Sequence, residues 1–252
     1  LVCEDSMEGI FSAVYDGWKE CAGGCKVSIQ TSFPVNMELF TSYREIVTDQ
    51  SKAGKVMRTI LMRLGSEVYE QICLAAASAD EDRGTAIYYV LHRAFGGGRC
   101  EKRVMEALAD PYVSRVAKLA LCVKREYHHY FGFVRFREIG GRFLLAKIQP
   151  GNDILSLMAL HFSNRFPNEN WVIYDEKRQK ALCHEKGKEC VMRKGVRIQV
   201  PGSAVGDMGE YEELWQTFCD SISIEARRNE KLQKQMLALH FRSNMPEFSV
   251  KG

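Results

Sequence analysis

The apolar residues of this chain change their spacing near residue 131, and this change limits the possible fold more than any other feature. Before it, apolar side chains recur every three or four residues, as on one face of a helix. After it, Phe133–Ile139 and Arg142–Gln149 alternate as strands do, and Gly140–Gly141 between them predicts a hairpin. Strands clustered between helical ends predict an α+β fold. We expect a small, largely antiparallel sheet at about residues 131–200, packed with amino- and carboxy-terminal helices.

Local signals place the other elements. Leu1–Cys3 is a candidate strand, and Asp5 with Glu8 is a capping-box-like start for the first helix. Asp110 and Pro111 fit the N-cap and N1 positions of a helix that runs to about Tyr130. The other predicted helices cover about residues 53–64, 66–78, 84–95, 101–109, 153–165, 210–227 and 229–241, and the other strands cover 26–30, 171–174, 180–184 and 189–200.

The chain shows no repeat and no low-complexity linker, so we expect one compact domain over residues 1–252, with possible lobes at 1–110 (mainly helical) and 111–252 (basic α+β). No segment approaches the roughly 20 apolar residues that cross a bilayer. The first residues are acidic where a signal peptide would be basic and then apolar, so export is not expected. Nine irregularly spaced cysteines indicate reduced thiols in the cytoplasm, not a disulfide framework.

Charge is distributed unevenly along the chain. Residues 111–200 carry 17 Lys and Arg against 8 Asp and Glu, whereas residues 1–110 have a net charge of −4 and residues 201–252 of −2. A basic segment between acidic flanks is typical of a face that binds a polyanion, because phosphate contacts dominate nucleic-acid affinity. A solvated, lysine-rich surface is the alternative interpretation.

The run from His129 to Phe136 partly matches the RNA-recognition-motif signature, whose aromatic side chains stack on bases. Its first two positions differ, and a long helix leads directly into it, so that fold is not expected. If 133–139 is a strand, Phe133, Arg135 and Arg137 share one face, which suits stacking and phosphate contact. A half-buried strand with a solvated outer face explains the pattern equally well.

Two cysteine patterns invite a metal-site interpretation. Cys21 and Cys25 have the first spacing of a radical-SAM cluster motif, but Ser28 stands where the third cysteine would be. The run Cys183–His184 with Cys190 supplies three zinc ligands and no fourth at a standard interval. We therefore predict no metal and no cofactor.

An acid/base site is a further hypothesis. Glu126 and His128 lie near the end of the basic helix, and His161 lies near the end of the next one. Together they would form an acid/base or metal-binding group if the fold brings them together, with Asp153 or Asp175 assisting. The alternative is that each histidine only interacts favourably with its helix dipole.

Five segments carry a resemblance to a known family. They are Arg125–His128, Gly132–Glu138, His161–Pro167, Trp171–Asp175 with Arg178, and Ile224–Asn229 with Leu232 and Gln233. Together with Tyr15–Gly17 they resemble a bacterial family described as DNA metabolism or DNA repair proteins. In that family the domain is also found fused to uracil-DNA-glycosylase-like domains, and it is encoded beside a radical-SAM protein.

The resemblance implies a DNA context and no particular reaction. This chain lacks the glycosylase's own motifs, so uracil excision by this chain alone is not expected. We expect a DNA-binding accessory protein of bacterial repair or modification, with a radical-SAM or glycosylase-type partner. Alternatives are a DNA-acting enzyme that uses the Glu/His site and a structural protein without nucleic-acid contact. The expected DNA-contacting residues are Lys118, Lys124, Arg125, Phe133, Arg135, Arg137, Arg165, Arg178, Arg227 and Arg228.

Overall fold

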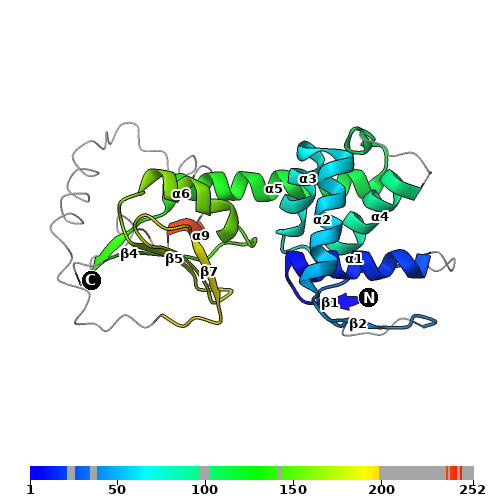
Figure 1. Cartoon of the computed structure of the whole chain (residues 1–252), viewed down its shortest axis with the longest axis horizontal. Helices are drawn as coiled ribbons and strands as arrows, with labels where there is room; N and C mark the ends of the chain where they lie inside the picture. Colours follow the sequence, from blue (N-terminus) through cyan, green and yellow to red (C-terminus); the bar gives the residue numbers. More distant parts are fainter. Residues whose placement is uncertain are drawn as a thin grey trace. The chain divides into compact units, whose positions relative to one another are not determined.

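The computed structural model describes residues 1–21, 26–34, 39–96, 103–140, 143–198, 237, 239–242 and 245. Internal contacts divide the chain into two compact units, Leu1–Arg125 and Glu126–Gly252 (Figure 1). The division falls inside one helix, α5 (Pro111–Phe133). Whether the chain behaves as one domain in solution stays a prediction for the proteolysis described below.

The first unit is mainly helical. Its short strand β1 (Val2–Cys3) pairs in parallel with β2 (Glu45–Ile46), and Gln30 makes an isolated bridge to Val2. The helices bury one continuous apolar core that includes Phe11, Ile72 and Ile87. They are α1 (Met7–Cys21), α2 (Gln50–Leu64), α3 (Ser66–Ala76), α4 (Arg83–Gly96), the 3₁₀ turn η1 (Val104–Glu106) and the first part of α5.

Side-chain caps fix the starts of α1, α2 and α5, and Asp49 is the cap of α2. Asp110 accepts hydrogen bonds from the N–H groups of Tyr112 and Val113, which confirms the predicted start of α5. The capping prediction for α1 was wrong, because the Ser6 hydroxyl accepts the Gly9 N–H, at 3.0 Å. Asp5 instead pairs with the buried guanidinium of Arg83 and so joins α4 to the start of the chain.

The second unit holds a five-stranded sheet in the order β3-β4-β5-β6-β7. All neighbours are antiparallel except β4 and β5, which are parallel and connected through the 3₁₀ turn η2 (Leu155–Met158) and α6 (Ala159–Arg165). The predicted α+β class is therefore confirmed. The strands are β3 (Arg137–Ile139), β4 (Phe143–Ile148), β5 (Trp171–Asp175), β6 (Lys180–His184) and β7 (Val191–Lys194).

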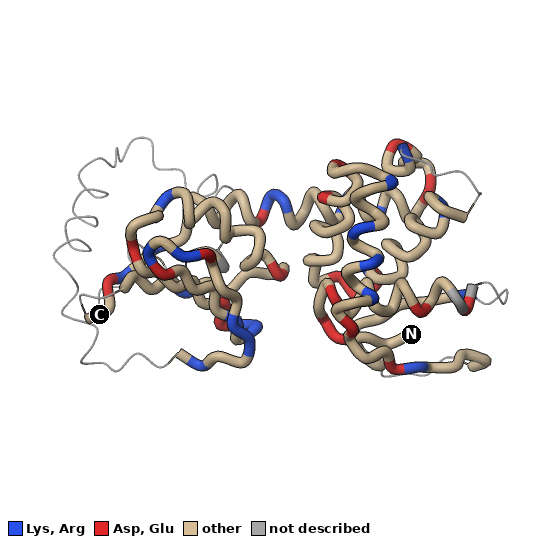
Figure 2. Tube along the Cα trace, in the orientation of Figure 1, with Lys and Arg blue, Asp and Glu red and all other residues tan. Residues whose placement is uncertain are grey.

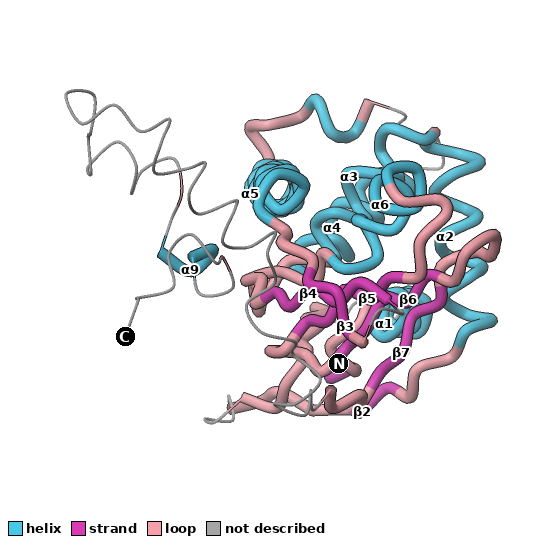
Figure 3. The backbone as a smooth tube through the Cα atoms, turned by 90° about the vertical axis from the view of Figure 1, so that its left-hand side faces the viewer, coloured by secondary structure: helices cyan, strands magenta, loops and turns pink. Residues whose placement is uncertain are grey.

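Both faces of this sheet bury apolar side chains, among them Trp171 on the inner face and Leu145 and Tyr174 on the opposite one. The inner face packs under η2 and α6 (Figure 3), and its Trp171 and Ile173 are fully buried, with the Phe162 ring of α6 at 6.2 Å from the Trp171 ring. The opposite face, here the outer face, is defined by the alternation of side chains and the pairing register. From β3 to β7 it carries Arg137 and Ile139, then Phe143, Leu145 and Lys147, then Val172 and Tyr174, then Ala181 and Cys183, and finally Val191 and Arg193.

Several predicted boundaries were wrong. Helix α5 continues through Phe133, and Val134 still donates its N–H to the Tyr130 carbonyl four residues back. The strand therefore begins only at Arg137, and Phe133 and Arg135 are not on a strand face with it. Within the described residues the helix predicted at 101–109 is only η1, that at 153–165 begins as η2, and the strand at 26–30 is a single bridge. The last two predicted helices lie outside the described residues, except for the turn α9 (Leu239–Arg242).

Candidate nucleic-acid interface

The outer face of the second unit's sheet carries exposed arginines on both edge strands. Arg137 stands on β3 and Arg193 on β7, and the register places both side chains on this face. Four strand spacings of about 4.8 Å separate the two strands by about 19 Å. Lys147 of β4 lies on the same face, with its ammonium 3.5 Å from the Glu176 carboxylate. Between the two edges the face is apolar, because Leu145, Tyr174 and Ala181 are buried and Val196 and Ile198 pack against them. The basic groups therefore lie along the edges of the face, a spacing that suits an extended polyanion.

In the described part of residues 126–198, Lys and Arg outnumber Asp and Glu along the chain (Figure 2). In the described part of residues 126–198, eight basic and only four acidic side chains are exposed. One pair of them, Lys188 and Glu185, lies within 2.8 Å and neutralises itself. The basic residues are Arg137, Arg165, Lys177, Lys186, Lys188, Arg193, Lys194 and Arg197, and the acidic ones are Glu138, Glu169, Glu185 and Glu189.

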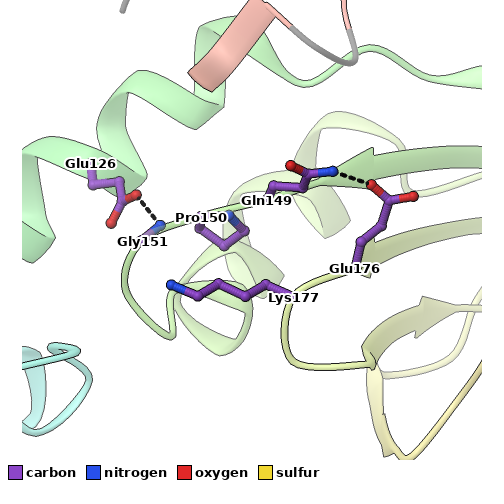
Figure 4. A pocket seen from close by; sticks show the side chains of 6 residues that line it. All are labelled: Glu126, Gln149, Pro150, Gly151, Glu176 and Lys177. Carbon is purple, nitrogen blue, oxygen red and sulfur yellow. Dashed lines mark hydrogen bonds between the residues drawn. The ribbon is translucent and has the colours of Figure 1, made fainter. Parts of the chain in front are cut away.

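The other acidic groups in the described part of residues 126–198 are held in internal bonds. Glu126 of α5 accepts three hydrogen bonds from the loop after β4: the Gly151 N–H at 2.6 Å, the Asn152 N–H at 3.0 Å and the Asn152 side-chain amide at 2.6 Å (Figure 4). Both carboxylate oxygens are thereby engaged. Asp153 forms an ion pair with Lys180. These carboxylates therefore hold the loop and do not face an approaching phosphate as bare charges.

Arg178 binds the same loop through its carbonyl groups. Its guanidinium donates to the Pro150 oxygen at 3.0 Å, to the Gly151 oxygen and to Asp175 at 3.2 Å. Asp175 is fully buried and also accepts the backbone N–H groups of Lys177 and Arg178. Burial raises the pKa of Asp175, and the hydrogen bonds and charge of Arg178 oppose that rise. The pair therefore fixes the loop and the turn after β5 together.

A pocket of about 510 Å³ opens beside this loop, lined by Glu126, Gln149, Pro150, Gly151, Glu176 and Lys177. The Gln149 amide donates to the Glu176 carboxylate at 2.8 Å, which engages the second acidic group of the pocket (Figure 4). Lys177 is exposed and extends along the pocket. The arrangement offers an anion one ammonium group and leaves its carboxylates engaged with protein donors.

The two candidate histidines meet at one aromatic ring. His161 stacks on Phe131 with ring centres 3.9 Å apart, and His128 lies edge-on to the same ring at 5.4 Å. The His161 Nε2 atom is buried and has no hydrogen-bond partner among the residues that the structure describes. Burial lowers the pKa of His161, and the charges of Arg165 and His128 add to that effect. The three hydrogen bonds of Glu126 described above go to the loop and not to either histidine.

The other predicted DNA contacts differ in their surroundings. Arg135 folds back onto the end of α5 and donates to the Gly132 oxygen at 2.8 Å. Phe133 packs against Phe241, with ring centres 5.3 Å apart. Arg165 is exposed and lies 5.6 Å above the Phe166 ring.

In the first unit, Lys118 and Arg125 are exposed on α5, and the Lys124 ammonium lies 3.5 Å from Glu70. Arg227 and Arg228 lie outside the described residues. Sequence reasoning missed Lys147 and Arg193. The predicted strand 189–200 already implies that Val191 and Arg193 share a face. The sequence does not show that this is the face that carries Arg137, because that depends on the pairing of the strands.

No three His, Cys, Asp or Glu side chains gather into a metal-binding group anywhere in the part of the chain that the structure describes. Cys190 instead lies 3.1 Å from the Ser163 hydroxyl. Within the same described ranges, no helix combines the length and the apolar character needed to span a bilayer.

Comparison with known proteins identifies a family. The model of DUF4130, a domain of unknown function, matches residues 81–247, which is 167 of the 252 residues. The chain belongs to this family. The DUF4130 region contains the whole described sheet and the loop that Glu126 and Arg178 hold. No curated protein and no solved structure shows a significant match to the chain.

Proposed function

We propose that this DUF4130 protein binds DNA through the outer face of its sheet. The observation that carries the proposal is that the basic side chains around that sheet are mostly exposed, whereas at least half of the acidic ones are bonded within the protein. Among the described residues of 126–198, exposed basic side chains outnumber exposed acidic ones, while Glu126, Asp153, Asp175 and Glu176 are bonded within the unit. Lys and Arg that face solvent in such numbers favour a phosphate backbone as partner.

The resemblance to DNA repair proteins supports the biological setting. We infer an accessory role in bacterial DNA repair or modification, beside a radical-SAM or glycosylase-type enzyme. Because the contacts would be made to phosphates, the protein would bind DNA of any sequence, and a partner enzyme would catalyse the repair or modification reaction.

Salt dependence tests the proposal directly. Binding of a fluorescent 25-base-pair duplex is followed by anisotropy between 50 and 200 mM salt. If about six phosphates are contacted, affinity falls by roughly 10³-fold over this range. Absence of binding by the wild-type protein at the lowest salt would remove the proposal.

A double variant then tests the outer face. Arg137→Ala with Arg193→Ala should weaken binding to every sequence and reduce the slope of log affinity against log salt by about 2, because two phosphate contacts are lost. The control, Lys26→Ala with Arg103→Ala, removes the same charge from exposed positions of the first unit. Equal affinity and slope in a folded Arg137/Arg193 variant would show that DNA does not contact this face.

A further inference from the structure

A second pocket, of about 490 Å³, lies within the first unit among α1, α2 and α4. Its floor is apolar and buried, and consists of Val14, Ile60 and Leu91. Three aromatic side chains and two basic ones complete the lining, with Val56 and Thr59 between them. The aromatic residues are Tyr15, Trp18 and Phe95, and the basic ones are Lys55 and Arg63.

The aromatic wall is held in place and yet open. Trp18 is 37% exposed although its indole packs edge-on to Phe95 at 6.2 Å and tilts against His92 at 5.6 Å. Neighbouring rings therefore fix its orientation, while part of it faces the pocket. An indole presented in this way offers a π surface on which a planar ring can stack, and base–aromatic stacking is a substantial, sequence-tolerant source of affinity.

The basic groups lie over the same wall. The Lys55 ammonium is 5.8 Å from the centre of the Tyr15 ring, and the Arg63 guanidinium is 5.5 Å from that of Phe95. Lys55, Thr59 and Arg63 recur every four residues and so line one face of α2. Eight residues at 1.5 Å each separate Lys55 from Arg63 by about 12 Å along the helix.

Helix α2 is an exception in an acidic region. It contains Lys52, Lys55, Arg58 and Arg63 and no Asp or Glu, whereas residues 1–110 have a net charge of −4 (Figure 2). Lys52 is neutralised by Asp16, at 2.8 Å. Lys55 and Arg63 therefore form a positively charged rim of the pocket within an otherwise acidic region. This local positive charge favours an anionic ligand.

We propose that this pocket binds a nucleotide, with the base stacked on Trp18 and the phosphate held by Lys55 and Arg63. The volume lies within the range of small-molecule sites, about 300–1,000 Å³. The apolar floor suits the base, and the rim supplies the charge that a phosphate requires. Two sources share this chemistry: a free nucleoside monophosphate and a single unstacked nucleotide of a nucleic-acid strand. The site belongs to the first unit and does not depend on DNA binding by the sheet.

Tryptophan emission of the full-length protein reports on the proposal. Titration with dAMP should quench the emission, because the base covers Trp18, whereas Trp171 is fully buried. The third tryptophan, Trp215, lies outside the described residues, so the titration is made in a Trp215→Phe background. Deoxyadenosine, which lacks the phosphate, should bind at least about tenfold more weakly, since hydrogen bonds to charged groups are the stronger ones. Emission that neither ligand changes at millimolar concentration, with no bound dAMP in equilibrium dialysis, would overturn the proposal.

Matched variants separate the two parts of the site. Lys55→Met with Arg63→Met should weaken dAMP to the level of deoxyadenosine and leave deoxyadenosine unchanged. Arg58→Met removes a charge from the same helix outside the pocket and should bind as the wild type does. Trp18→Leu should lose binding of both ligands in dialysis, with its fold checked by circular dichroism. A folded Trp18→Leu protein with unchanged dAMP affinity would refute the stacking arrangement.

The source of the nucleotide follows from comparing dAMP with a five-residue single strand, (dA)₅. Tighter binding of the oligonucleotide, lost in the Lys55/Arg63 variant, assigns the pocket to a strand, and equal or weaker binding assigns it to the free nucleotide. The Arg137→Ala/Arg193→Ala variant should retain dAMP binding. Failure of the duplex experiment with intact dAMP binding would therefore remove the proposed function and leave this inference standing.

Discussion

Replacement of Arg178 by methionine should destabilise the second unit strongly. The substitution removes the guanidinium that bonds to the Pro150 and Gly151 carbonyls and to Asp175, whose side chain is fully buried. Breaking one partner of a buried pair costs about 3–5 kcal/mol, because the other charge is left uncompensated. For a unit of this size such a loss lowers the melting temperature by roughly 10 °C or more.

The companion variant isolates the cause. Asp175→Asn in the Arg178→Met background removes the uncompensated charge while its amide oxygen still accepts the two backbone N–H groups. We expect it to recover part of the loss and to leave a deficit of about 1–2 kcal/mol for the missing carbonyl bonds. Urea unfolding and thermal melts of both variants measure these differences.

Lys177→Met is the control for charge, since it removes a cation from the adjacent exposed position and should cost under about 0.5 kcal/mol. If the Arg178→Met protein has the melting temperature of the wild type, this reasoning is refuted. Arg178 would then be a candidate for phosphate contact again.

Two further predictions concern His161 and the two units. Burial lowers the pKa of His161, so the unfolded chain binds more protons than the folded one below about pH 6.5, and stability should fall as the pH drops from there. His161→Phe keeps a ring on Phe131 and removes the titrating group, so the free energy of unfolding should depend less on pH. The change in its slope should be less than about 1.4 kcal/mol per pH unit, measured by urea titrations at pH 5–7.5. An unchanged slope would contradict this prediction. Limited proteolysis should release no stably folded 111–252 fragment, because α5 runs through the division between the units. Recovery of such a fragment by size-exclusion chromatography would show a separable domain.

The fold class was predictable because the signals that define it are local. The Asp110–Pro111 start of α5 needs only the geometry of a helix end, and the antiparallel pairing of β3 with β4 needs only a short connection between two alternating segments. The end of α5 was less predictable. Its last aromatic residues, Tyr130 and Phe133, pack against Phe241, more than 100 residues away, and this contact stabilises helix where local alternation indicates strand.

The candidate interface depended on register, which a sequence does not contain. Arg137 and Arg193 share the outer face only because four successive strand pairings align them, and a one-residue slip in any strand would turn its side chains to the other face. The same limit explains Arg135. Its position two residues from Arg137 implies a shared face only if both lie on a strand, and the strand begins after it.

The residues that carry the family resemblance have two different roles in the structure. Glu126 and Arg178 come from segments 52 residues apart, and both bind the loop at Pro150–Asn152, one through its N–H groups and the other through its carbonyls. Because both side chains hold this loop, their presence in the motif has a structural reason. Arg137 belongs to the same resemblance and instead faces solvent on an edge strand. The motif therefore does not by itself identify the residues that we propose to contact DNA. Exposure and register separate Arg137, whose removal should change affinity, from Arg178, whose removal should change stability.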